Sequence, residues 1–207
     1  MDFQHPFRIL TPNLEGDILS LLSRADKSYT GREMQRALGV SQDAVRLALR
    51  RLATQGVVTA EPGGGRAILY QLNRDHLASP WIQGIASLRL ELIERLRSEI
   101  QGWTVQPAAA VLFGSVARNE ATRTSDLDLL IIRPARVGAD DDAWQAQLLA
   151  LIDAANRWTG NEARVLEYGA DELIGLVGQE PVLQHAAEEG IDLAGSFRSL
   201  WKQAQRS

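Results

Sequence analysis

Two carboxylates and a glycine-serine pair are the groups in this sequence best suited to chemistry. Gly114-Ser115 follows the apolar run 111–113, and Asp126 and Asp128 lead into the apolar run 129–132. Side chains alternate between the two faces of a strand, so Asp126 and Asp128 would point the same way. Two neighbouring carboxylates repel each other unless a divalent cation or a proton lies between them. The pair therefore predicts a metal site.

The glycine-serine pair supplies a complementary feature. Gly114 permits a tight turn, and the backbone N–H groups that follow Ser115, at the start of a helical turn, suit an anionic phosphate. Phosphate-binding groups beside metal-binding carboxylates are what a nucleoside triphosphate with magnesium requires. We therefore expect a nucleotide site between residues 114 and 128.

The spacing of these residues resembles a known signature. Gly114-Ser115-Val-Ala-Arg118 followed by Ser125-Asp126-Leu-Asp128 is similar to the motif of the DNA polymerase beta type of nucleotidyltransferases, and closest to their minimal nucleotidyltransferase branch. Asn119 stands where that branch usually has glycine, but asparagine also tolerates a left-handed backbone. The resemblance covers roughly residues 105 to 170. It implies an α/β (α+β) domain in which helices flank a small mixed sheet.

The resemblance also implies roles for individual residues. Asp126 and Asp128 would hold one or two Mg²⁺ ions, while Gly114, Ser115, Arg118 and Ser125 would bind the nucleotide, with ATP expected. The domain would transfer a nucleoside monophosphate to an acceptor hydroxyl on an unknown protein or RNA.

The resemblance also implies a third carboxylate on a strand next to the aspartate pair. Glu167 is the candidate for this catalytic and metal-binding position, and Asp171 is the second choice. The alternative is that Glu167 is a strand-end carboxylate paired with an arginine such as Arg164. If no third acid completes the site, the domain could sense nucleotide without catalysing transfer.

The elements around this site follow from the apolar pattern. A strand should reach Phe113 and a second should end at Arg133-Pro134. A helix should run from about residue 140 to 158, with Asp140 to Asp142 in its first turn, where negative charge is favourable. A short strand should follow over 162–168, and the tail from 170 onward should be helical.

The N-terminal part has a separate pattern. A helix is predicted over 14–23, a second after the capping-box residues Thr30 and Glu33, and a third from Gln42 to about Gln55. A strand, a glycine-rich turn and a second strand then fill 57–72. Over residues 14–74 this order resembles the winged helix-turn-helix of bacterial transcriptional regulators.

That resemblance implies DNA binding. The second helix of such a motif lies in the major groove. By position, Ser41, Gln42 and Arg46 would reach base edges, while Arg50 would contact phosphate and Arg66 phosphate or the minor groove. The alternative is a winged helix used only for protein contacts or dimerisation.

Ser79-Pro80 marks the start of a connecting helix predicted from residue 81 to about 101. We therefore expect a winged helix-turn-helix domain at 1–76, a connecting helix within 77–103 and a nucleotidyltransferase domain at 104–207. A homodimer is expected by analogy only.

Composition limits the remaining possibilities. The 207 residues include no cysteine, which excludes disulfides and thiolate metal sites. Residues 1–76 carry ten Lys or Arg against eight Asp or Glu, whereas the rest carries twelve against eighteen. No apolar stretch reaches the ~18 residues of a membrane span. Composition thus favours a cytoplasmic protein, and the two resemblances imply double-stranded DNA and a nucleoside triphosphate as its partners.

Overall fold

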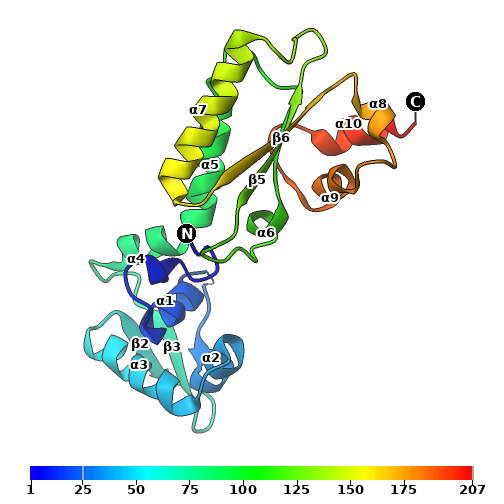
Figure 1. The fold of residues 1–207 in the computed structure, drawn as a ribbon. Helices are drawn as coiled ribbons and strands as arrows, with labels where there is room; N and C mark the ends of the chain where they lie inside the picture. The colour runs from blue at the N-terminus through cyan, green and yellow to red at the C-terminus, as the bar shows by residue number, and fades with distance from the viewer. Residues whose placement is uncertain (25, 207) are drawn as a thin grey trace. The chain divides into compact units, whose positions relative to one another are not determined.

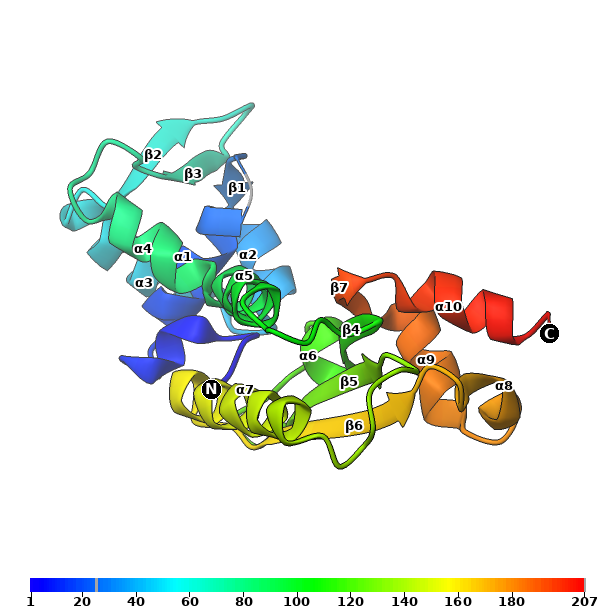
Figure 2. The ribbon, with the colours of Figure 1, turned by 90° about the horizontal axis from the view of Figure 1, so that it is seen from above.

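The computed structural model describes residues 1–24 and 26–206, and the chain divides into two compact units (Figure 1; seen from above in Figure 2). One unit, here called the N-terminal unit, comprises residue 2 and residues 4–88. The other, the C-terminal unit, comprises residues 1 and 3 and residues 89–207. The predicted domain boundary at 207 lies outside the described residues.

The N-terminal unit contains helices and a small sheet in the predicted order. Its elements are the 3₁₀ helix η1 (Pro6–Ile9), α1 (Leu14–Arg24), β1 (Tyr29–Thr30), α2 (Gly31–Leu38), α3 (Gln42–Thr54), β2 (Val58–Pro62), β3 (Ile68–Leu72) and α4 (Ser79–Ala86).

Local hydrogen bonds explain where the two central helices begin and end. The Thr30 side chain accepts a hydrogen bond from the Glu33 N–H, and the Glu33 side chain accepts one from the Thr30 N–H, so the predicted capping box is confirmed. Gly39 ends α2 in a left-handed conformation, with φ of 66°. The Ser41 side chain then caps α3 by accepting from the Ala44 N–H.

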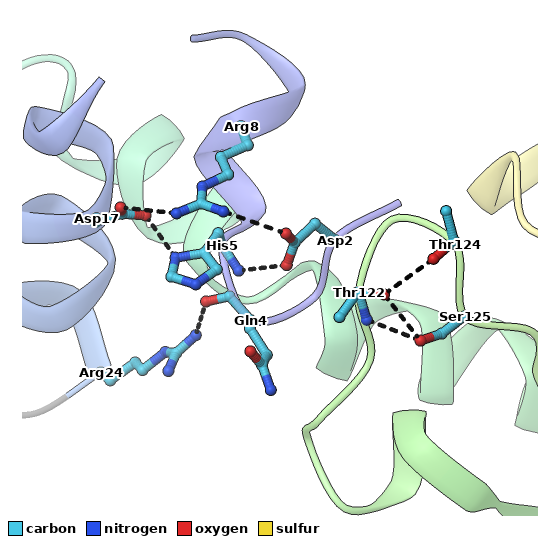
Figure 3. Close-up of polar contacts among 9 residues, drawn as sticks. All are labelled: Asp2, Gln4, His5, Arg8, Asp17, Arg24, Thr122, Thr124 and Ser125. Carbon is cyan, nitrogen blue, oxygen red and sulfur yellow. Dashed lines mark hydrogen bonds and ion pairs between the residues drawn. The ribbon is translucent and has the colours of Figure 1, made fainter. Parts of the chain in front are cut away.

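The start of α1 is tied to the chain before it. Asp17 lies 2.7 Å from the Nδ1 atom of His5, and its second oxygen lies 3.4 Å from Arg8 (Figure 3). Arg8 is also 3.8 Å from Asp2. The segment before α1 therefore includes the helical turn η1.

The sheet of the N-terminal unit has the order β1-β3-β2, and both pairings are antiparallel. Val58 pairs with Leu72 and Pro62 with Ile68, so β2 and β3 form a hairpin around the glycine-rich turn. Apolar residues of α1, α2, α3 and this hairpin share one core, including Ile18, Met34 and Leu49, which are almost fully buried.

The single helix predicted over 81–101 is wrong. Two helices occupy this stretch, α4 and α5 (Leu88–Gln101), with Ser87 between them at φ of −100° and ψ of 11°. The Ser87 hydroxyl donates to the carbonyl oxygens of Gln83 and Gly84, a local bond that competes with a continuous helix. The connection therefore consists of one helix in each unit.

The C-terminal unit contains a sheet with helices on both faces. Its elements are α5, β4 (Ala109–Phe113), α6 (Gly114–Ala117), β5 (Leu127–Arg133), α7 (Asp142–Thr159), β6 (Ala163–Gly169), α8 (Leu173–Leu176), α9 (Pro181–Glu189), β7 (Ile191–Gly195) and α10 (Phe197–Ala204). Asp141 caps α7 by accepting from the Trp144 N–H, which gives one of the three consecutive aspartates a structural role.

The sheet is mixed, as predicted. Its strand order is β6-β5-β4-β7, which can be followed across Figure 2. β4 pairs antiparallel with both β5 and β7, whereas β5 and β6 are parallel and are joined through α7. The strand β7 was not predicted, because the tail was expected to be helical throughout.

Side chains of β5 alternate between two apolar layers. Leu127, Leu129 and Ile131 pack in the layer formed by α5 and α7, and Leu130 and Ile132 pack in the layer formed by α8, α9 and α10. Figure 1 shows these two groups of helices on opposite sides of the sheet. The two layers fix which side chains can meet near the aspartate pair.

Candidate active site

The turn after β4 is built around Gly114. Its φ is +70°, a left-handed conformation that residues with a Cβ rarely adopt, and α6 begins here. A Cβ at this position would lie 2.3 Å from Oδ2 of Asp128. Since Phe113 pairs with Asp128 across β4 and β5, the missing side chain of Gly114 is what lets the carboxylate lie against the turn.

The aspartate pair lies at the start of β5. Asp128 is on the strand, and Asp126 comes directly before its first residue, Leu127. Both side chains are partly exposed, while Leu127 between them is buried. The alternation predicted for this segment is therefore confirmed for the strand residues.

The two carboxylates affect each other's protonation. Burial raises the pKa of Asp128, and the negative charge of Asp126 raises this pKa further, while the charges of Arg164 and Arg118 act in the opposite direction. A divalent cation would remove this repulsion, and Mg²⁺ is commonly held by one or two carboxylates together with water and substrate phosphates. The two aspartates thus suit a single magnesium ion.

The loop before the pair is held by short polar contacts. The Thr122 N–H donates to the Ser125 hydroxyl at 2.9 Å, and the Thr122 and Ser125 hydroxyls lie 3.3 Å apart (Figure 3). The buried Asn161 donates from its side chain to the Ser125 carbonyl at 2.7 Å. In the structure, Ser125 therefore shapes the loop that leads into Asp126.

Glu167 is not brought to the aspartate pair. It pairs in register with Ile131, so it lies on the α7 face of the sheet, whereas Asp128 pairs with Arg164 on the other face. Glu167 accepts hydrogen bonds from Trp144 and Arg133, both at 2.9 Å. The expected metal-binding role of Glu167 is thus contradicted by its position, and its arginine partner is Arg133 rather than Arg164.

The second choice, Asp171, is also remote from the pair. It follows Gly169, the last residue of β6, while the aspartates lie at the opposite, amino-terminal end of the parallel strand β5. At about 3.3 Å per residue, a seven-residue strand separates these ends by roughly 20 Å. In the described chain, no three His, Cys, Asp or Glu side chains are grouped so that they could hold a metal ion.

This sheet with its glycine turn and paired aspartates can be compared with known families. Residues 90–173 match the family model of the nucleotidyltransferase domain. Over these residues the C-terminal unit is therefore similar to a nucleotidyltransferase domain. No curated protein matches the sequence.

Two solved structures are similar to this chain at low identity. One is described as a toxin-antitoxin with AMP-PNP; the alignment has 16% identity and a TM-score of 0.37, and covers 56% of this chain and 83% of the other. The second is a mutant of the toxin-antitoxin MntA-HpeT, with 13% identity, a TM-score of 0.39, and 55% and 84% coverage. At these TM-scores the likenesses carry no argument about function.

Arg118, expected near phosphate, is engaged with carboxylates of the C-terminal unit. Its guanidinium lies 2.8 Å from Glu120 and 3.0 Å from Glu189 of α9. The residue after it, Asn119, has a φ of 59°, which confirms that asparagine keeps the turn that the family usually makes with glycine. The motif therefore retains its backbone shape despite the substitution.

Two further residues near the site were missed by sequence reasoning. Arg89 donates to the carbonyl oxygens of Val116 and Ala117 and so holds the end of α6. Arg164 lies 2.8 Å from Asp126. The strand register that brings Arg164 to this position depends on the pairing of β5 with β6, which the sequence does not display.

The residues predicted to contact DNA all belong to the N-terminal unit and are exposed. Ser41, Gln42, Arg46 and Arg50 lie at the start and along the outer face of α3, and Arg66 lies in the hairpin turn. Arg46 pairs with Asp43 at 3.0 Å, and the Ser41 hydroxyl is used as the helix cap.

Within the described residues, every helix is too short or too polar to cross a lipid bilayer.

Proposed function

We propose that the nucleotidyltransferase domain binds a magnesium-bound nucleoside triphosphate, with ATP as the expected nucleotide. The observation that carries this proposal is the close approach of the Asp128 carboxylate to the Gly114 turn, where a Cβ would be only 2.3 Å from Oδ2. Gly114 and Ser115 would bind the phosphates, and Asp126 and Asp128 would hold the metal. Magnesium, when bound, would supply the positive charge that lets carboxylates and phosphates lie together.

We further propose that the bound nucleotide acts as a signal and is not turned over. The support comes from β6, whose side chains on the face of Asp128 are Arg164, Leu166 and Tyr168. None of these is a carboxylate, so this strand offers no group to accept the proton of an attacking hydroxyl or to complete a second metal site. β6 therefore supplies no ligand for the second of the one or two metal ions that the resemblance implies.

Nucleotidyl transfer is the second candidate, and the match of residues 90–173 to the nucleotidyltransferase domain favours it. In that reaction the oxygen of an acceptor hydroxyl forms a bond to the α-phosphorus of the nucleotide. The bond from this phosphorus to the β-phosphate breaks, pyrophosphate leaves, and the hydroxyl proton passes to solvent or to a group on the acceptor. The acceptor would be a protein or an RNA.

The two candidates differ in one measurement. The protein is incubated with ATP labelled at the α-phosphate and Mg²⁺, and both bound label and released pyrophosphate are followed. We expect the wild-type protein to bind label, Asp126→Asn/Asp128→Asn to lose at least tenfold in affinity, and neither protein to release pyrophosphate. Release or self-labelling that disappears in the double variant would establish transfer, whereas equal binding by both proteins would refute the site.

For the N-terminal unit we propose a winged helix-turn-helix that binds double-stranded DNA. The order α1, α2, α3 and a β2-β3 hairpin, with β1 added to the same sheet, supports this assignment. The exposed positions at the start of α3 support major-groove contacts by Ser41, Gln42 and Arg46, with Arg50 and Arg66 on the backbone. The chain would then be a transcriptional regulator that responds to nucleotide.

If Arg46 contacts DNA, its ion pair with Asp43 must be exchanged for that contact. Both side chains are more than half exposed, so the pair is weak and can be exchanged for a contact to DNA. We expect Arg46→Ala to weaken binding to the protein's own promoter DNA at least tenfold. Arg51→Ala is the matched control, because Arg51 faces Glu15 of α1 at 2.9 Å.

Fluorescence anisotropy of labelled promoter DNA, with and without Mg²⁺ and a nonhydrolysable nucleotide, would measure both effects. A change of DNA affinity on adding nucleotide supports a nucleotide-responsive regulator. Absence of DNA binding even at low salt would instead favour a module for protein contacts.

A further inference from the structure

The site has an arginine where a third acidic ligand would be needed. β5 and β6 are parallel, and their register places Arg164 beside Asp128. Residues paired in this way point to the same face of a sheet. The nearest group from β6 to the aspartate pair is therefore a guanidinium, a permanent positive charge.

Arg164 is already in contact with the pair. Its Nη1 lies 2.8 Å from Oδ2 of Asp126, and its Nη2 donates to Glu162 at 3.4 Å. The pKa of Arg164 is raised, first by its hydrogen bond to Glu162 and next by the charge of Asp126. Its side chain is 57% exposed, so solvent and a ligand can reach it.

Besides Arg164, the positive charge that acts on Asp128 is that of Arg118. The chain has only two lysines, Lys27 and Lys202, and neither is near the aspartates in sequence. Arg118 is held by Glu120 and Glu189. A triphosphate brings several negative charges, and one Mg²⁺ is largely offset by two carboxylates. A guanidinium, whose planar fork fits phosphate oxygens, would supply the missing charge.

We propose that Arg164 takes the place of a second metal ion: it pairs with Asp126 in the nucleotide-free protein and turns to a phosphate oxygen when magnesium and nucleotide bind. This inference rests on the proposed nucleotide site. It makes Arg164 a nucleotide-binding residue and makes one magnesium ion sufficient.

The two roles of Arg164 have opposite effects on two ligands. In the nucleotide-free protein, Arg164 neutralises part of the charge that would attract a metal, so its removal should strengthen the binding of Mg²⁺ alone. In the complex, Arg164 would hold phosphate, so its removal should weaken the binding of nucleotide. A residue that merely supports the fold would weaken both.

Isothermal titration calorimetry can measure both affinities on the full chain. The titrants are MgCl₂ alone and a nonhydrolysable ATP analogue in excess Mg²⁺. For Arg164→Ala we expect roughly tenfold weaker analogue binding and severalfold tighter Mg²⁺ binding, as for loss of one charge contact at short range. Arg164→Lys, which keeps the charge but loses the fork, should be intermediate for the analogue.

Arg136→Ala is the matched control, because Arg136 is exposed in the loop after β5, at the far end of the strand from Asp126. It removes the same charge and should leave both affinities as in the wild type. Suppose that the wild type binds the analogue. If Arg164→Ala then binds the analogue equally well, or if it also binds Mg²⁺ more weakly, the role of Arg164 is refuted while the proposed nucleotide site stands. If the wild type binds no analogue, the proposed function is overturned and the inference with it.

Discussion

The absence of a side chain at Gly114 makes room for the carboxylate of Asp128. Both the positive φ and the 2.3 Å approach argue that no other residue fits here. In Gly114→Ala the new Cβ would displace Asp128, and the left-handed backbone would cost about 1–2 kcal/mol of stability. We expect at least a tenfold loss of magnesium-dependent nucleotide affinity, measured by equilibrium titration.

Gly160 provides a control for the backbone cost alone. It also has a φ of +70°, but a Cβ there would meet no atom within 4 Å. Gly160→Ala should therefore lose similar stability and keep its nucleotide affinity. Equal affinity losses in the two variants would show that strain, and not the displaced carboxylate, is responsible.

The contacts of Glu167 indicate that this carboxylate stabilises the fold and does not bind nucleotide. It is 22% exposed, pairs with the buried Arg133 and accepts from Trp144 of α7. Glu167→Ala would leave the Arg133 charge and the indole N–H without this partner, and we expect a loss of about 2–3 kcal/mol in the free energy of unfolding. Nucleotide affinity of the folded variant, measured well below its melting temperature, should not change. A large loss of affinity without loss of stability would return Glu167 to the site.

At the scale of the element, the capping box of α2 gives a stability that depends on pH. Hydrogen bonds from the Thr30 backbone and then from its side chain lower the pKa of Glu33 in the folded state. An acid with a lowered pKa in the folded state stabilises the fold above its unfolded pKa, and this stabilisation is lost as the pH falls through the folded value.

We therefore expect Glu33→Gln to be less stable than the wild type at neutral pH, and the difference to shrink as the pH falls below the ordinary pKa of a glutamate, about 4.5. Urea unfolding followed by circular dichroism, at several pH values down to about 3, measures this difference. A difference that stays constant over the whole range would contradict the role given to the carboxylate.

Local patterns explain why some elements could be predicted and others could not. Thr30 with Glu33, Ser41 and Gly39 are caps whose signals lie within a few residues, and each is present in the structure. The break at Ser87 comes from its hydroxyl, which donates to a carbonyl oxygen of the preceding helical turn. A single serine within an apolar helical pattern is only a weak signal for such a break. β7 depends on pairing with β4, about 80 residues earlier in the chain, and so leaves no local signal.

The candidate site was predictable only in part for the same reason. Gly114, Asp126 and Asp128 lie within 15 positions and could be recognised by spacing. The face of β6 that meets them is set by a register one residue away from the alternative that would have placed Glu167 on the same face of the sheet as Asp128. A shift of one residue reverses the faces of a strand. Because the sequence does not show the register, it led to the prediction of Glu167 at the site, where the structure has Arg164.

At the scale of the whole molecule, the two units differ in charge. The N-terminal unit carries ten Lys or Arg and eight Asp or Glu, and the C-terminal unit carries twelve and eighteen. A mildly basic unit suits a polyanion such as DNA, while an acidic unit needs a cation before it can hold a triphosphate. Metal dependence is therefore the property on which the account of the C-terminal unit depends.

The Mg²⁺ dependence of nucleotide affinity tests the proposed metal-bound triphosphate site most directly. Binding of a fluorescent ATP analogue to the full chain is titrated with Mg²⁺ present and with Mg²⁺ removed by a chelator, for the wild type and for Asp126→Asn/Asp128→Asn. We predict that Mg²⁺ strengthens binding to the wild type at least tenfold and has little effect on the double variant. Equal affinity of the wild type with and without Mg²⁺ would contradict a metal-bound triphosphate between the Gly114 turn and the two aspartates.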